Sequence, residues 1–73
     1  MRLLIECEFS NGTQVLIKDP ATEADYDVLT AAQSGDPDAV LGVLCRIRPD
    51  GPERERLIRA GAIRSVTREP STR

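Results

Sequence analysis

The stretch LLIECEFSNGTQVLIK, residues 3–18, decides the fold because it carries the clearest secondary-structure signal in the chain. Two runs rich in β-branched and apolar residues flank Asn11-Gly12, and this dipeptide is among the strongest short-range signals for a β-hairpin. We therefore expect strands at 3–9 and 13–18, joined by a tight turn. The rest of the chain is expected to cover one face of this hairpin.

Side-chain alternation selects the register of the predicted hairpin. A three-residue loop, Ser10-Asn11-Gly12, pairs Ile5 with Ile17 and gathers most apolar side chains on one face. A one-residue slip would move a strand's apolar set to the wrong side, so this register is preferred. The opposite face then carries two glutamates and two leucines: Leu4, Glu6, Glu8 and Leu16. Two leucines exposed on one sheet face mark a candidate partner surface.

Two helices are expected directly after the hairpin. The first spans 23–33, where Thr22 is the N-cap and Asp25 completes a capping box. The second spans 37–47 and begins with Pro37 at its first position. It is apolar around most of its circumference, so we expect it to be the most buried helix.

A third helix at 52–60 and a strand at 62–68 complete the predicted α+β domain. Proline at the start of 52–60 favours a helix, and β-branched residues favour the last strand. The predicted fold is two to three short helices packed on one face of a two- or three-stranded sheet. It occupies residues 1–68 as a single small domain, with a frayed C-terminal tail at 69–73.

Composition excludes most catalytic and metal chemistry. The chain has no histidine, and its only cysteines are Cys7 and Cys45, so neither a Ser/His or Cys/His pair nor a good zinc site can be assembled. No glycine-rich phosphate loop occurs, and we expect no enzyme and no cofactor. With no signal peptide or membrane-length apolar run in sight, we expect a cytoplasmic protein. Both thiols are expected to be buried and free, with a Cys7–Cys45 disulfide as the alternative.

Charge is distributed unevenly along the chain. Residues 1–45 set Arg2 and Lys18 against eight carboxylates, a net charge of −6, whereas residues 46–73 set eight arginines against four carboxylates, a net charge of +4. The acidic half favours a basic protein partner, such as a nucleic-acid-binding protein or complex. The arginines favour phosphate groups and guanine edges.

These features predict a small non-enzymatic protein-binding module, an inhibitor or adaptor that blocks or bridges a larger assembly. The profile is typical of phage-encoded inhibitors of host nucleic-acid-handling defence complexes, anti-CRISPR proteins among them. The expected partner-binding residues are two leucines and six carboxylates: Leu4, Glu6, Glu8, Leu16, Asp25, Asp27, Asp36 and Asp38.

Two alternatives stay open. One is a small, dimeric, nucleic-acid-binding regulator in which 37–47 and 52–60 form a helix-turn-helix. Its nucleic-acid contacts would come from four arginines: Arg54, Arg56, Arg59 and Arg64. The other is a structural or accessory subunit of a larger particle, whose C-terminal strand pairs with a neighbouring subunit.

Overall fold

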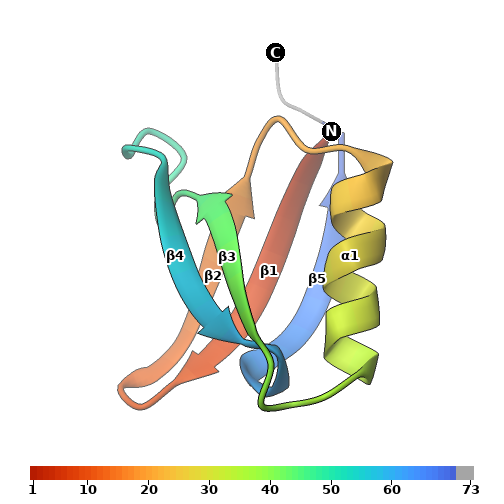
Figure 1. Cartoon of the computed structure of the whole chain (residues 1–73). Helices are drawn as coiled ribbons and strands as arrows, with labels where there is room; N and C mark the ends of the chain where they lie inside the picture. Colours follow the sequence, from red (N-terminus) through yellow and green to blue (C-terminus); the bar gives the residue numbers. More distant parts are fainter. Residues whose placement is uncertain (71–73) are drawn as a thin grey trace.

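The computed structural model describes residues 1–70, which form five strands, one α-helix and one short 3-10 helix (Figure 1). In chain order these are β1 (Arg2–Phe9), β2 (Gly12–Lys18), α1 (Glu23–Ser34), β3 (Val40–Cys45), β4 (Arg54–Arg59), the 3-10 helix η1 (Ala60–Ala62) and β5 (Ile63–Glu69). The strands make two antiparallel sheets, one with the order β2-β1-β5 and the other formed by β3 and β4.

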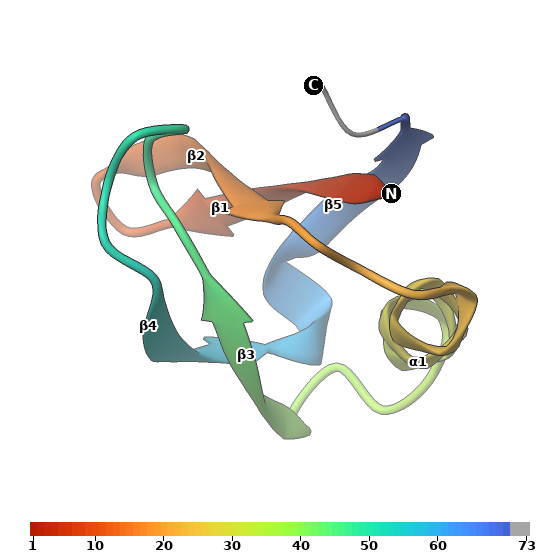
Figure 2. The same cartoon turned by 90° about the horizontal axis from the view of Figure 1, so that it is seen from above.

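The β3–β4 sheet and α1 lie side by side against the same face of the three-stranded sheet (Figure 2). The two sheets join where Ile17 and Arg46 exchange backbone hydrogen bonds, each with an N···O distance of 2.7 Å. After β4, the backbone N–H of Ala60 donates to the carbonyl oxygen of Ala39 at 2.8 Å. The first contact joins the end of β3 to β2, and the second continues the pairing of β3 with β4 beyond Val40 and Arg59.

The predicted helices at 37–47 and 52–60 are wrong, and with them the prediction of two to three helices packed on one sheet. Asp36 does not cap a helix; its Oδ1 accepts the backbone N–H of Asp38 at 3.0 Å in a turn that leads into β3. β3 is apolar on both of its faces, a pattern that a short buried strand and a buried helix share. The second sheet of the structure consists of the two segments that were predicted to be helices.

Three predicted elements are confirmed: the hairpin strands, the first helix and the C-terminal strand. The capping box of α1 is present, with the Asp25 N–H donating to Thr22 Oγ1 at 3.2 Å and the Thr22 N–H donating to Asp25 Oδ2 at 2.8 Å. β5 pairs with β1, one of the two hairpin edges that the predicted C-terminal strand could join. Of the predicted tail, Glu69 belongs to β5, and residues 71–73 lie outside the described residues.

The predicted register of the first hairpin is wrong. Phe9 lies opposite Gly12, so the turn consists of Ser10 and Asn11, and Ile5 lies opposite Leu16. Leu16 is consequently fully buried, whereas its neighbour Val15 is 44% exposed. Three apolar residues follow one another at 15–17, so alternation alone does not identify the inward one. Gly12 has a φ of +122°, a conformation that favours glycine.

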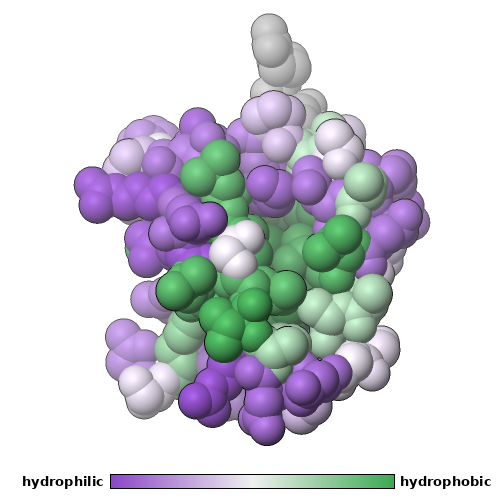
Figure 3. Space-filling view, in the orientation of Figure 1, coloured by the Kyte–Doolittle hydropathy of each residue, from purple (hydrophilic) through white to green (hydrophobic). Residues whose placement is uncertain are grey.

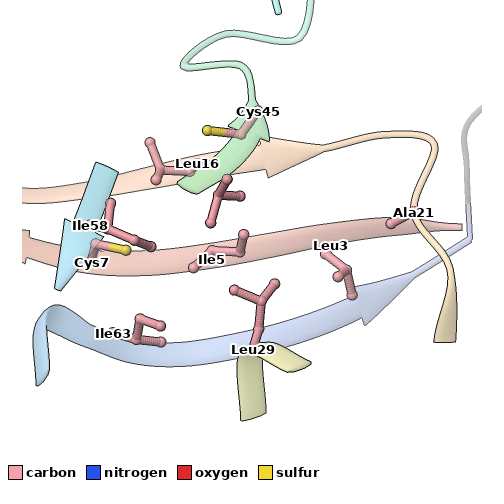
Figure 4. Packing of buried hydrophobic residues seen from close by; sticks show 10 residues of the cluster. Leu3, Ile5, Cys7, Leu16, Ala21, Leu29, Cys45, Ile58 and Ile63 are labelled. Atoms are coloured by element: carbon pink, nitrogen blue, oxygen red, sulfur yellow. The ribbon is translucent and has the colours of Figure 1, made fainter. Parts of the chain in front are cut away.

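The core fills the space between the two sheets and α1 (Figure 4). Its main side chains come from every strand and from the helix: Leu3, Ile5, Cys7, Leu16, Leu29, Val43, Cys45, Ile58 and Ile63. Each large aliphatic side chain buried in this way stabilises the fold by about 1.5–3 kcal/mol. At the edge of the core, the guanidinium of Arg68 on β5 lies 4.3 Å from the ring centroid of Tyr26 on α1. Its Nη1 also donates to both Glu23 carboxylate oxygens, at 2.7 and 2.8 Å, and so holds α1 against β5.

Candidate interaction surface

Four large apolar side chains lie exposed on one side of the molecule, and we call them the apolar face. They are Val28 of α1, Val40 and Leu44 of β3, and Leu57 of β4, with exposed fractions of 59%, 61%, 46% and 73%. The space-filling view shows the green apolar surface gathered over β3, β4 and the neighbouring side of α1 (Figure 3). Exposed apolar patches on soluble proteins are common places of interaction, so this face is the candidate site.

The pairing of β3 with β4 explains why this face is apolar. Val40, Gly42 and Leu44 alternate with the inward-facing residues of β3, so they share the outer side of the sheet. Leu57 lies directly opposite Gly42 and finds no cross-strand side chain there. Both sides of β3 are therefore apolar, although only the inner side is needed for the core.

A groove runs between α1 and β3 on the same side of the molecule. It holds about 140 Å³ and is lined by Val28, Leu29, Leu41, Gly42, Val43 and Leu44, with Lys18 and Asp25. Lys18 Nζ donates to the backbone carbonyl of Leu44 at 3.1 Å, and Asp25 is engaged in the capping box. This volume is below the roughly 300 Å³ at which small-molecule pockets begin, and it suits a single side chain of a protein partner.

The surface predicted from the hairpin is not assembled in the predicted form. Leu16 is buried in the core and Leu4 is half-buried beside Ile17, so neither is a freely exposed leucine. Glu6 Oε1 accepts the hydroxyl of Ser65 at 3.2 Å, and Glu8 forms an ion pair with Arg64 of β5. This arginine compensates part of the acidic charge on the outer side of the hairpin.

The four predicted aspartates lie at both ends of α1. Asp25 and Asp27 lie on its first turns, and Asp36 and Asp38 lie in the segment between α1 and β3. The helix has 12 residues and is therefore about 18 Å long, so the two pairs are separated along its length. Asp27, Asp36 and Asp38 are exposed, and Asp25 is half-buried.

The arginines proposed for nucleic-acid binding are divided between two strands. Arg54, Arg56 and Arg59 lie on β4, so the predicted helix-turn-helix does not exist, and Arg64 lies on β5 in its ion pair with Glu8. Arg54 and Arg56 line a second hollow together with Arg48, Ile47, Gly51 and Pro52. The Nε of Arg56 is buried and has no hydrogen-bond partner among the described residues.

The two cysteines are buried and free, as the leading prediction stated. Burial raises the pKa of the Cys7 thiol to about 11, with a smaller contribution from Cys45, and burial also raises the pKa of the Cys45 thiol. Since the thiolate is the reactive form, both side chains are weak nucleophiles in the folded protein. They serve as small apolar groups of the core.

The sequence did not predict the apolar face, because three of its four residues, Val40, Leu44 and Leu57, were placed in helices that do not form. A strand assignment for VLGVLC at 40–45 would have put Val40 and Leu44 on one side and Leu41, Val43 and Cys45 on the other. Gly42 was the available signal, since glycine inside a helix is destabilising by about 1 kcal/mol relative to alanine.

Within residues 1–70, no group of three or more histidine, cysteine, aspartate or glutamate side chains is placed to hold a metal ion. No helix in this range has the length and apolar character that a membrane crossing requires. Comparisons with protein-family models, with curated proteins and with solved structures found no match.

Proposed function

We propose that the protein is a non-enzymatic protein-binding module, an inhibitor or adaptor that docks onto a larger assembly through its apolar face. The observation that carries the proposal is the exposure of Val28, Val40, Leu44 and Leu57 on one side of the molecule (Figure 3). Full burial of such a side chain is worth about 1.5–3 kcal/mol, and roughly half to three quarters of that remains to be gained at each of these four partly exposed residues. A partner that covers this face recovers part of that free energy.

The groove beside the face supplies a place for an anchoring side chain. In protein interfaces a few buried side chains set in pockets contribute most of the binding free energy, and polar groups form the rim. Here Leu29, Leu41 and Val43 line the groove, and Lys18 and Asp25 carry the charges at its border. The partner expected from this arrangement presents one aliphatic or aromatic side chain, surrounded by polar groups of both signs.

The proposal is tested by capturing the partner from cells that express the protein naturally. Tagged wild-type protein is compared with a Leu44→Asp variant, and captured proteins are identified by mass spectrometry. Leu44 is 46% exposed, so the substitution should leave the fold intact, as checked by circular dichroism and thermal unfolding. We expect Leu44→Asp to capture at least about tenfold less of a specific partner than the wild type does. A charge in an apolar interface costs more than about 1.4 kcal/mol of binding free energy, which corresponds to this factor.

Val15→Asp is the matched control. Val15 is 44% exposed, almost the same fraction as Leu44, but it lies on β2 outside the apolar face. It should retain the partner. Equal loss in both variants, or equal capture by both, would remove the apolar face as the binding surface.

A second candidate function, nucleic-acid binding, rests on the hollow that Arg48, Arg54 and Arg56 line together. None of the three is in an ion pair within residues 1–70. A gel shift of duplex DNA and of single-stranded RNA at low salt tests this function, because phosphate contacts are strongest there. A shift that Arg54→Ala abolishes would support it, and the absence of any shift at low salt would reject it.

A further inference from the structure

The outer edge of β4 is a strand edge without a backbone partner. β4 pairs with β3 on one side, and within residues 1–70 no backbone hydrogen bond connects its other side to another element. The tip of the first hairpin leaves a hollow next to this edge, lined by Phe9, Ser10, Asn11 and Gln14 together with residues 56–58. Unpaired N–H and C=O groups on such an edge are a template for a further strand.

The sequence of β4 is self-complementary in charge. Its burial alternates, with Ile58 almost completely buried on the inner side, so Glu55, Leu57 and Arg59 share the outer side of the strand. The acidic and the basic residue lie two positions before and two positions after the leucine. An antiparallel pair of identical strands centred on Leu57 therefore places Glu55 of each copy opposite Arg59 of the other.

Other centres for the same two-fold pairing are less favourable. If the axis passed through Glu55, two glutamates would lie opposite each other, and Arg54 would oppose Arg56. If it passed through Arg56, two arginines would meet on the axis. Like charges directly opposite each other destabilise a strand pair. Among the registers centred on a residue of β4, only the one centred on Leu57 pairs opposite charges without also placing like charges opposite each other.

We propose that a second copy of this chain pairs with the β4 edge in an antiparallel register, with Leu57 of both copies on the two-fold axis. The two β3–β4 sheets then form one four-stranded sheet with the order β3-β4-β4-β3. Its outer side carries both apolar faces, which meet at the two Leu57 side chains, and Val28, Val40 and Leu44 of each copy stay uncovered. Formation of the dimer does not depend on the proposed partner, because the dimer uses the edge of β4 and the partner's anchoring side chain would use the groove.

Charge exchange at two positions tests the register. The wild-type dimer is measured by sedimentation over about a hundredfold range of concentration, since a dimer responds to concentration by mass action. Glu55→Arg should raise its dissociation constant at least about tenfold, because both cross-strand ion pairs become repulsive. Adding Arg59→Glu to the same chain exchanges the two charges and should restore the constant to within about threefold of wild type.

The control variant is Asp27→Arg, which changes the net charge equally but lies on α1, away from β4. It should dimerise like the wild type. A wild type that remains monomeric over the whole concentration range would overturn the proposal. So would an Asp27→Arg effect equal to that of Glu55→Arg, or a double variant that does not recover.

Disulfide trapping gives a second measurement. Directly opposite residues in an antiparallel pair have Cα atoms about 4.5–5.5 Å apart, within the range that a disulfide spans. Leu57→Cys should therefore form a covalent dimer on mild oxidation, whereas Val40→Cys, which is 61% exposed but one strand away from the axis, should not. The native thiols of Cys7 and Cys45 are buried and do not compete. Equal cross-linking of both variants, or none of Leu57→Cys, would contradict the register.

The outcomes for the dimer and for the proposed function can be separated. A Glu55→Arg variant that is monomeric but still captures the partner would support both proposals. Loss of the dimer signal in every form of the protein, with capture still dependent on Leu44, would reject only the dimer.

Discussion

Gly42 of β3 lies directly opposite Leu57 of β4, and this pair shapes the exposed side of the second sheet. Because Gly42 has no side chain, Leu57 stands 73% exposed without an apolar neighbour across the strand pair. The space above Gly42 is occupied by the carboxylate of Glu55, since a Cβ built on Gly42 would lie 2.9 Å from Glu55 Oε2. Gly42 therefore lies between the exposed Leu57 of the apolar face and the carboxylate of Glu55.

Replacing Gly42 with alanine should stabilise the protein. Glycine within a strand is destabilising by about 0.5–1 kcal/mol relative to alanine, because it loses more backbone entropy on folding. The one close contact of the new methyl group is the end of the flexible Glu55 side chain, which can rotate away. Urea unfolding should show a gain of about 0.5 kcal/mol for Gly42→Ala. A loss of stability would mean that Glu55 is held in place more firmly than its exposed position indicates.

The same substitution at Gly61 should have the opposite sign. A Cβ on Gly61 would lie 2.9 Å from the Cβ of Pro37 and 3.0 Å from its carbonyl oxygen. The Gly61 N–H also donates to that carbonyl at 3.0 Å, so the two segments cannot separate without losing a hydrogen bond. We expect Gly61→Ala to destabilise the protein by about 1–3 kcal/mol in the same unfolding measurement. Equal effects at the two glycines would show that backbone entropy outweighs these contacts.

Two neighbouring residues of β2 distinguish the observed hairpin register from the predicted one. Leu16 is fully buried between the sheets, so Leu16→Ala should cost about 2–5 kcal/mol. Val15 is 44% exposed, and Val15→Ala should cost less than about 1 kcal/mol. Thermal or urea unfolding of both variants decides the register, because the three-residue loop would bury Val15 and expose Leu16.

The sequence predicted those elements whose local signals are specific. Asn11-Gly12 identified the first hairpin, and the Thr22–Asp25 capping box located the start of α1. Both signals depend on contacts within a few residues, so they survive without knowledge of the tertiary structure. The C-terminal strand was also predicted, from its β-branched residues.

The β3–β4 hairpin was missed because its signals were ambiguous. A short apolar run such as 40–45 is compatible with a buried helix or strand, and proline at 37 and 52 favoured helix starts. Asp50-Gly51 between the two strands is itself a hairpin-type dipeptide, but it was read as a turn between helices. Pairing of β4 with β3 decided the outcome, and the apolar run and the two prolines obscured the one local signal for it.

The interaction surface was mispredicted for the same reason. Leu44 and Leu57 lie in the segments predicted to be helices at 37–47 and 52–60, so they could not be recognised as exposed strand residues. The one-residue error in the hairpin register had the converse effect and placed the buried Leu16 on the surface. In a sheet, a one-residue error moves a side chain to the opposite side, and the predicted surface changes completely.

Stability should fall in alkaline solution because of Cys7. Burial raises the pKa of its thiol from 9.0 to about 11, so the folded state keeps the proton over a range in which the unfolded state has lost it. The stabilising contribution is fully present below about pH 9 and is lost as the pH rises towards 11. A rise from 9.0 to about 11 corresponds to at most about 2.7 kcal/mol of unfolding free energy, part of which urea unfolding at about pH 8 and about pH 10.5 would detect.

Cys7→Val separates this contribution from the titration of other groups. Valine fills a similar apolar space without a proton to lose, so the variant should lose less stability between the two pH values than the wild type does. All other ionisable groups are common to the two proteins, so their contributions cancel in the comparison. A wild type and a Cys7→Val variant that lose the same free energy would show that Cys7 is ionised as easily in the folded protein as in the unfolded chain. The thiol would then have to be accessible to water, contrary to its complete burial between the two sheets.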